Sequence, residues 1–318
     1  MNTLAAILVQ FFELLAALLL APLLTGWVNQ CRAWLQNKTA PPMMLPFRQY
    51  AKLLEKEAVL ANNVSSLFRM APYIIFACMA LASMIVPTLS SSLMLAPAAD
   101  AIALVGLFAL ARIFIALAGM DIGTAFGSLG ARREMLIGFL AEPALLMVFF
   151  TASLISKSTS LSTMVEALGQ RGFIVYPSLA FAGVAFTMVA LAENARIPVD
   201  NPTTHLELTM IHEAMILEYS GRHLALIECA VALKLYVYFC LGVALFVPWG
   251  IPEGADLLNL LQALPLLLLK LAVGGFLLAL IETISAKMRV FRAPEFLGTA
   301  FMLAVLGMLV HLLLETGK

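Results

Sequence analysis

Apolar residues run through this chain in long stretches that short polar segments separate. A helix needs roughly 20 mostly apolar residues to cross the hydrocarbon core of a bilayer. The stretches that satisfy this requirement predict eight spans, over residues 4–28, 71–93, 101–120, 135–156, 173–192, 226–249, 257–281 and 296–314. No repeat or low-complexity tract interrupts the series. The pattern therefore predicts an all-α, polytopic integral membrane protein with one membrane domain over residues 1–318.

Two polar loops, 29–70 and 193–225, are much longer than the others. In the first loop Phe47, Tyr50 and Leu53 recur at helical spacing, with basic residues between them. This alternation predicts an amphipathic helix that lies in the membrane interface. Such a helix is either a passive surface element or a docking element for a partner, and the pattern leaves both open.

Composition supports a membrane protein and narrows the functions. Hydrophobic residues make up 62% of the chain and charged residues 12%, against about 45–50% and 25% in soluble domains. A soluble enzyme of this length could not bury so much apolar surface. The formal net charge is zero, so no bulk electrostatic attraction favours nucleic acid.

Basic residues are distributed unevenly between the two sides of the predicted membrane domain. Most loop Lys and Arg residues fall on the side of loops 29–70 and 193–225, and the opposite side has only Lys157, Arg171 and Lys318. Positive residues collect in cytoplasmic loops. We therefore expect a prokaryotic plasma (inner) membrane protein with cytoplasmic long loops and both termini on the outer side.

The cysteines and histidines give little support for a bound metal. The four cysteines lie far apart without a C-x-x-C pair, whereas iron–sulfur clusters and structural zinc need clustered thiolates. We expect them to be apolar packing residues. His205 and His212 would share a helical face, but no third ligand has a matching spacing. We therefore expect no metal and no cofactor in this chain.

Ionisable residues inside the apolar stretches are candidates for function, because each costs at least about 2.5–3.5 kcal/mol to insert. Those within spans are Glu13, Arg112, Glu142, Glu228, Lys234 and Lys270, and those near span ends are Asp121, Glu134, Glu193 and Glu282. Separate structural ion pairs would explain a few of them. A set this large favours a polar path, because acid–base chains build proton relays. Glu13 lies on the first span, which we expect at the periphery, where it would snorkel or meet one partner.

The loop 193–225 is the most informative segment. It carries Glu193, Arg196, Pro198 and Asp200, and it ends on Glu218-Tyr219-Ser220-Gly221. Five acids, two histidines and one arginine within 26 residues, from Glu193 to Glu218, predict a hydrated, acid-lined surface.

Together with Arg133-Glu134, Glu142-Pro143, Lys234 and Lys270, these motifs resemble one known family over nearly the whole chain. The chain is similar to the eight-helix membrane subunit shared by respiratory complex I and the energy-converting membrane-bound NiFe hydrogenases, including formate hydrogenlyase. The resemblance implies a subunit that anchors the peripheral redox arm and couples electron transfer to H⁺ or Na⁺ movement. It implies no redox centre or catalytic site in this chain.

The resemblance also implies roles for single residues. Members of the ion-coupling path would be Arg112, Asp121, Glu134, Glu142, Glu193, Glu207, Glu218, Glu228, Lys234, Lys270 and Glu282. Residues facing the peripheral arm would be Lys38, Lys52, Arg133, Arg196, Asp200, His205, His212, Glu213 and Tyr219. Expected partners are the large subunit of a hydrogenase and its small iron–sulfur subunit, or their complex I equivalents, together with antiporter-like membrane subunits and the lipid bilayer. The NiFe centre and the iron–sulfur clusters belong to those partners.

Departures from the complex I pattern decide between the branches. Thr203 and His205 stand where complex I has further acids, and the interval from Glu207 to Glu218 is longer. We therefore favour a hydrogenase-type or formate-hydrogenlyase-type complex over a quinone reductase. A quinone-site subunit remains the alternative, which an apolar, tail-sized channel near residues 193–221 would favour. A secondary transporter and a purely structural anchor are further alternatives.

Overall fold

The computed structural model describes residues 3–61, 63–91, 95, 100–170, 176–200, 211–252, 257–286, 288 and 292–316. These residues form the helices α1 to α11, and the predicted all-α fold is confirmed. His205 and Glu207, both predicted functional residues, lie outside the described residues.

Seven described helices are long and apolar enough to cross a membrane. They are α1 (Thr3–Leu35), α3 (Ser66–Ile85), α4 (Ala101–Asp121), α5 (Ala125–Ser156), α9 (Gly221–Phe246), α10 (Leu257–Ile284) and α11 (Ala293–Thr316). The remaining predicted span, 173–192, corresponds to α7 (Pro177–Glu193), an apolar helix of 17 residues. Each long helix among the described residues thus overlaps one predicted span.

The shorter helices differ in how well the pattern predicts them. The amphipathic surface helix is confirmed as α2 (Leu45–Glu55). Two others, α6 (Leu161–Gln170) and α8 (His212–Ile216), are not predicted by the pattern. Helix α6 has only ten residues, so its apolar face gives no span-length signal.

The start of α5 is a correction to the predicted boundary. The helix begins at Ala125, ten residues before the predicted span, and the Thr124 side chain accepts a hydrogen bond from the Gly127 backbone N–H at that end. The polar residues Arg132, Arg133 and Glu134 directly precede the apolar stretch and therefore set the predicted boundary at residue 135. A helix that contains polar residues can nevertheless extend beyond the hydrocarbon core.

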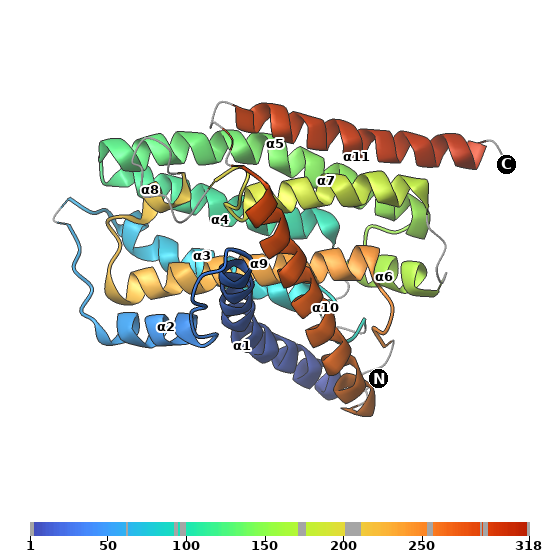
Figure 1. Ribbon diagram of the computed structural model, residues 1–318, viewed down its shortest axis with the longest axis horizontal. Coiled ribbons are helices and arrows are strands. Elements are labelled where there is room, and N and C mark those ends of the chain that lie inside the picture. The colour runs from blue at the N-terminus through green and yellow to red at the C-terminus, as the bar shows by residue number, and fades with distance from the viewer. Residues whose placement is uncertain are drawn as a thin grey trace.

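Two helices depart from the common direction of the bundle. Helices α3, α4, α5, α7, α9 and α11 run roughly along the long axis, whereas α1 and α10 cross it obliquely (Figure 1). The main contacts of α10 are with α1, and few are with α9. The Trp27 indole N–H of α1 donates to the Ala272 carbonyl of α10 at 2.9 Å. Helices α2 and α8 lie at one end, and α6 and both termini lie toward the other (Figure 1).

Candidate functional site

Arg112 of α4 is the centre of a buried cluster of charges. Its guanidinium contacts Glu142 of α5 and Glu193 of α7 through its two terminal nitrogens, and its Nε lies 3.4 Å from Glu134 Oε1. The other oxygen of Glu193 lies 2.9 Å from the Lys234 ammonium of α9. Four helices therefore contribute five charged side chains to one connected set, which we call the Arg112 cluster.

The geometry of α5 explains why both of its acids meet one arginine. Glu134 and Glu142 are separated by about two helical turns and so lie near one face. Gly138 lies between them, and a Cβ at this position would overlap the Arg112 guanidinium. This glycine leaves the space that the guanidinium occupies. The sequence signal for it was a glycine midway between two acids in an apolar helix.

The charges of the Arg112 cluster do not cancel. Among the described residues with printed ion pairs, three carboxylates face two cations, so these five side chains carry an excess negative charge when all are ionised. Burying an uncompensated charge is costly. One proton or one small cation would balance the set, which gives the cluster a chemical reason to bind and release a positive charge.

A small cavity of about 40 Å³ adjoins the cluster. Arg112, Glu134, Lys234 and His212 of α8 contribute to its lining. The Nε2 atom of His212 is buried without a hydrogen-bond partner, and burial lowers the pKa of this imidazole. The space suits a water molecule, which needs polar partners of this kind. The family resemblance puts His212 on the arm-facing surface, but the structure places it beside the cluster.

A second ion-pair group lies near the same end of the bundle. Glu282 of α10 contacts Arg196 at 3.2 Å and Arg32 of α1 at 3.5 Å. The structure thus places Arg196, predicted at the arm interface, inside the bundle, and it joins α10 to the segment after α7. No ion pair joins this group to the Arg112 cluster in the part of the chain that the structure describes.

Other predicted path residues lie apart from the cluster. The Lys270 ammonium donates to the Val247 carbonyl at 2.7 Å and to the Trp249 carbonyl, at the end of α9. Asp121 accepts a hydrogen bond from the Ser65 backbone N–H at 3.0 Å, before the start of α3. Glu218 and Glu228 are exposed. The structure therefore brings together only part of the predicted path.

The predicted arm-facing residues also divide. Lys38 and Lys52 are exposed, Arg133 and Glu213 are half-buried, and Asp200 is buried. Tyr219 is buried as well, where its ring stacks on Phe68 with centroids 3.9 Å apart and its hydroxyl donates to the Phe68 carbonyl at 2.9 Å. Tyr219 is therefore a structural link to α3 in this chain.

Glu13 is a correction to the expected peripheral position. Its side chain is 1% exposed, and Oε1 accepts hydrogen bonds from the backbone N–H groups of Leu89 and Ser90, at 3.0 and 3.2 Å. The Thr88 hydroxyl donates to the same oxygen at 3.3 Å. Neutral donors from the segment after α3 thus hold this carboxyl inside the bundle.

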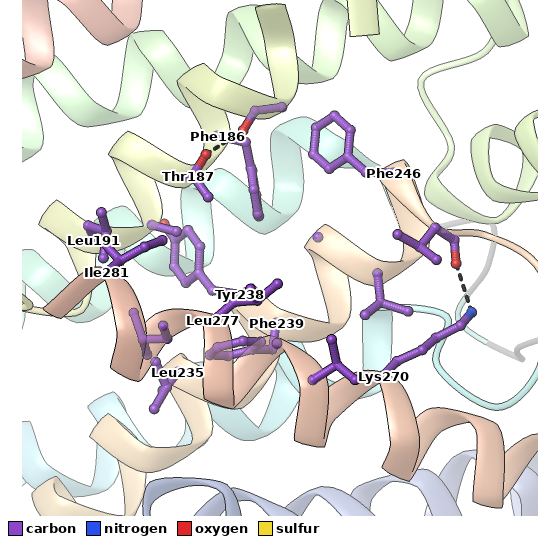
Figure 2. A pocket seen from close by; sticks show the side chains of 18 of the residues that line it. Phe186, Thr187, Leu191, Leu235, Tyr238, Phe239, Phe246, Lys270, Leu277 and Ile281 are labelled. Carbon is purple, nitrogen blue, oxygen red and sulfur yellow. Dashed lines mark hydrogen bonds between the residues drawn. The ribbon is translucent and has the colours of Figure 1, made fainter. Parts of the chain in front are cut away.

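A large apolar cavity of about 560 Å³ lies between α7, α9 and α10 (Figure 2). Phe186, Leu235, Phe239 and Leu277 are among its walls, and it reaches Asn194 and Arg196 after α7. Its position meets the criterion for a tail-sized channel near the 193–221 loop.

Comparisons with known proteins find relatives over nearly the whole chain. A family model described as NADH dehydrogenase matches residues 7–313. Formate hydrogenlyase subunit 4 of Escherichia coli (strain K12) is 30% identical over 95% of this chain and 97% of its own length. Hydrogenase-4 component C of the same organism is 32% identical over 91% of this chain and 90% of its own.

More distant similarities extend to other complexes. An NADH-quinone oxidoreductase subunit of Rickettsia bellii (strain OSU 85-389) is 26% identical over 58% of this chain and 54% of its own length. A chain in the solved structure of the membrane-bound sulfane sulfur reductase, an archaeal respiratory membrane complex, superposes with a TM-score of 0.83 at 20% identity. That superposition covers 97% of this chain and 99% of the other, and it shows that the two share a fold.

Proposed function

Since this chain belongs to the NADH dehydrogenase family, we propose that it is the membrane-anchor and ion-coupling subunit of a hydrogenase-type or formate-hydrogenlyase-type complex. It would dock a peripheral redox arm and link electron transfer to H⁺ or Na⁺ movement. The two relatives at 30% identity or more carry names of that kind and match over nearly their whole length. The NADH-quinone oxidoreductase relative matches over only about half of its length.

The observation that carries this proposal is the connected Arg112 cluster within the spans. A residue set that only anchors helices needs paired charges, whereas this set has one carboxylate more than its cations. Acid–base chains inside a membrane domain are the usual construction of proton relays. Moving one charge against 100 mV requires about 2.3 kcal/mol, which a redox event in a partner could supply.

Burial suggests a direction for the path. His212 and the small cavity lie on the α8 side of the cluster, and the Glu193 side chain at the centre is 2% exposed. The Glu142 side chain is 31% exposed. We propose that a proton enters through the water site beside His212 and leaves from Glu142 toward a neighbouring antiporter-like membrane subunit.

The end with α2 and α8 would face the cytoplasm of a prokaryotic cell and carry the peripheral arm. It holds the exposed basic residues Lys38 and Lys52 and the exposed acid Glu218. Both termini lie toward the opposite end (Figure 1), which the uneven distribution of basic residues assigns to the outer side. The proposed partners on the cytoplasmic face are hydrogenase large and small subunits that hold the NiFe centre and the iron–sulfur clusters.

The experiment is a coupling assay on the intact complex in proteoliposomes. Glu193→Gln removes the charge that both Arg112 and Lys234 contact, so the ratio of ions moved to electrons transferred should fall about tenfold or more. Electron transfer in detergent and subunit composition should persist. Glu295→Gln, at an exposed acid in the first turn of α11, is the matched control. A normal ratio in Glu193→Gln would refute coupling through the cluster.

A quinone-site subunit is the second candidate, and the 560 Å³ cavity near Asn194 and Arg196 is the observation that favours it. Quinone analogues would inhibit such a complex, and inhibitor resistance would follow from substitutions in the cavity walls. A hydrogenase-type complex should be insensitive to the same analogues.

A further inference from the structure

The oblique packing of α10 on α1 creates the large apolar cavity. Because α10 has few contacts with α9, a space remains between α10 on one side and α7 and α9 on the other. Gly183, Gly242 and Gly274 contribute to the walls, one from each of these helices, and each lets a phenylalanine ring of the wall pack close to its backbone.

The side chains that line the cavity favour a hydrocarbon ligand. Both cations that touch the cavity are engaged. Lys270 donates to carbonyls at the end of α9 (Figure 2), and Arg196 pairs with Glu282. Most other lining side chains are aliphatic or aromatic. Water does not fill spaces of that kind.

The volume of the cavity and its opening toward the lipid-facing surface favour a single hydrocarbon chain from the bilayer as the ligand. A helix about 10 Å across would fill 560 Å³ with less than about two turns, so a membrane helix of a partner does not fit inside. Leu269, Val273 and Leu277 of α10 line the cavity and are about half exposed or more. The cavity therefore communicates with the surface that the membrane-spanning helices turn toward lipid.

We infer that this cavity binds one acyl chain of a membrane phospholipid, whose polar head lies at the end marked by Asn194 and Arg196. The Oδ1 atom of Asn194 is buried without a hydrogen-bond partner. An amine or hydroxyl donor of a phospholipid head group would satisfy it. The inference goes beyond the proposed function and does not depend on it.

The bound chain would also shield the Arg112 cluster from one side. Tyr238 lines the cavity, and its ring stacks on Phe108 of α4, one turn before Arg112, with centroids 5.0 Å apart. Its buried hydroxyl has no hydrogen-bond partner. Hydrocarbon on the cavity side of Tyr238 would keep water from joining the cavity to the cluster.

The test uses the intact complex in nanodiscs that contain phosphatidylethanolamine with a diazirine on one acyl chain. After irradiation, mass spectrometry locates the lipid adducts. We expect adducts concentrated on cavity residues such as Phe239 and Leu277, above the level at Met302, an exposed position on α11. Labelling needs no turnover, so this result and the coupling assay can fail independently.

Two matched variants sharpen the test. A Cβ at Gly183 would lie 3.4 Å from the Phe246 ring, so Gly183→Leu adds its side chain to the cavity with little clash. Cavity adducts should fall about tenfold. Gly106→Leu makes the same change on α4, where nothing lies within 4 Å, and should leave the adducts unchanged.

Three outcomes would overturn the inference. Cavity adducts no more frequent than those at Met302 would show that lipid does not enter, and this comparison needs only the wild-type complex. Unchanged adducts in an assembled Gly183→Leu complex would place the lipid elsewhere. Quinone that copurifies at one molecule per complex and blocks the lipid adducts would assign the cavity to quinone and favour the second candidate function.

Discussion

Glu193 and Glu13 are both buried in the bundle, yet the structure holds the two carboxyl groups in opposite ways. Glu193 contacts two cations on two other helices, and through Arg112 it is joined to two further acids. Glu13 accepts hydrogen bonds from two backbone N–H groups and one hydroxyl. Among the described residues no cation pairs with it.

The difference shows that a buried carboxyl group need not belong to a network of ion pairs. Neutral hydrogen-bond donors from one chain segment can hold a single carboxyl group in place and attach that segment to α1. Charged partners on four helices form a set in which a change at one member alters the field at every other, because electrostatic effects are strong where water is excluded. The candidate site is therefore distinguished by ion pairs that link several charged side chains, and not by burial in the membrane domain.

The largest effect is expected from removal of Arg112, the cation that the three acids of the cluster share. Arg112→Gln leaves three carboxylates with only Lys234 to compensate them, and breaking a buried pair costs about 3–5 kcal/mol. We expect a severe loss of assembled complex and a much lower melting temperature in detergent. Unfolding followed by intrinsic fluorescence measures it. An unchanged melting temperature would mean that the acids are already neutral or otherwise compensated.

A smaller change reaches the same cation by packing alone. In Gly138→Ala the added methyl group overlaps the Arg112 guanidinium, and overpacking of this kind costs about 1–3 kcal/mol. Gly106→Ala on α4, with open space around it, is the control and should be neutral or slightly stabilising. Thermal unfolding of both variants tests whether the guanidinium position is as tightly fixed as we infer.

The two carboxyl groups also show what the sequence reveals and what it hides. Arg112, Glu142 and Lys234 were predictable because a charge inside an apolar run is conspicuous. Their pairing was not predictable, since two of the acids that contact Arg112, Glu142 and Glu193, lie 30 and 81 residues away along the chain. Glu13 was misplaced because its main donors are backbone N–H groups, which every non-proline residue has.

The same reasoning applies to the fold. Length and apolarity located the spans, because a bilayer imposes both. They gave no signal for α6, which lies outside that requirement, or for the early start of α5. Nor could they predict that α10 leans on α1, a contact that joins Trp27 to Ala272 across most of the chain.

The Glu13 site should tolerate loss of charge better than the Arg112 cluster does. In Glu13→Gln the amide oxygen can still accept from Leu89, so we expect a loss of about 1 kcal/mol or less. Glu13→Leu would leave the donors unsatisfied and cost about 1–3 kcal/mol. If Glu13→Gln proved as harmful as Arg112→Gln in the same unfolding assay, a hidden counter-charge would have to hold Glu13.

The smallest expected effect concerns pH at the edge of the cluster. Burial lowers the pKa of His212, against the opposing charges of Glu134 and Asp200, while Lys234 acts in the same direction as burial. The unfolded chain then binds a proton more readily, so acidification below about pH 6.5 should destabilise the folded state. His212→Gln should lose less stability than wild type over that interval. Equal losses would show that other groups govern the acid response.

The contact between α1 and α10 has a consequence for how the protein is made. During translation α1 is synthesised first and α10 almost last. The face of α1 that carries Trp27 therefore lacks its contact with α10 through most of synthesis. Insertion of α10 would then close the bundle. A chain interrupted before residue 257 should keep this face open to lipid or to a membrane chaperone, and quality control could recognise it there.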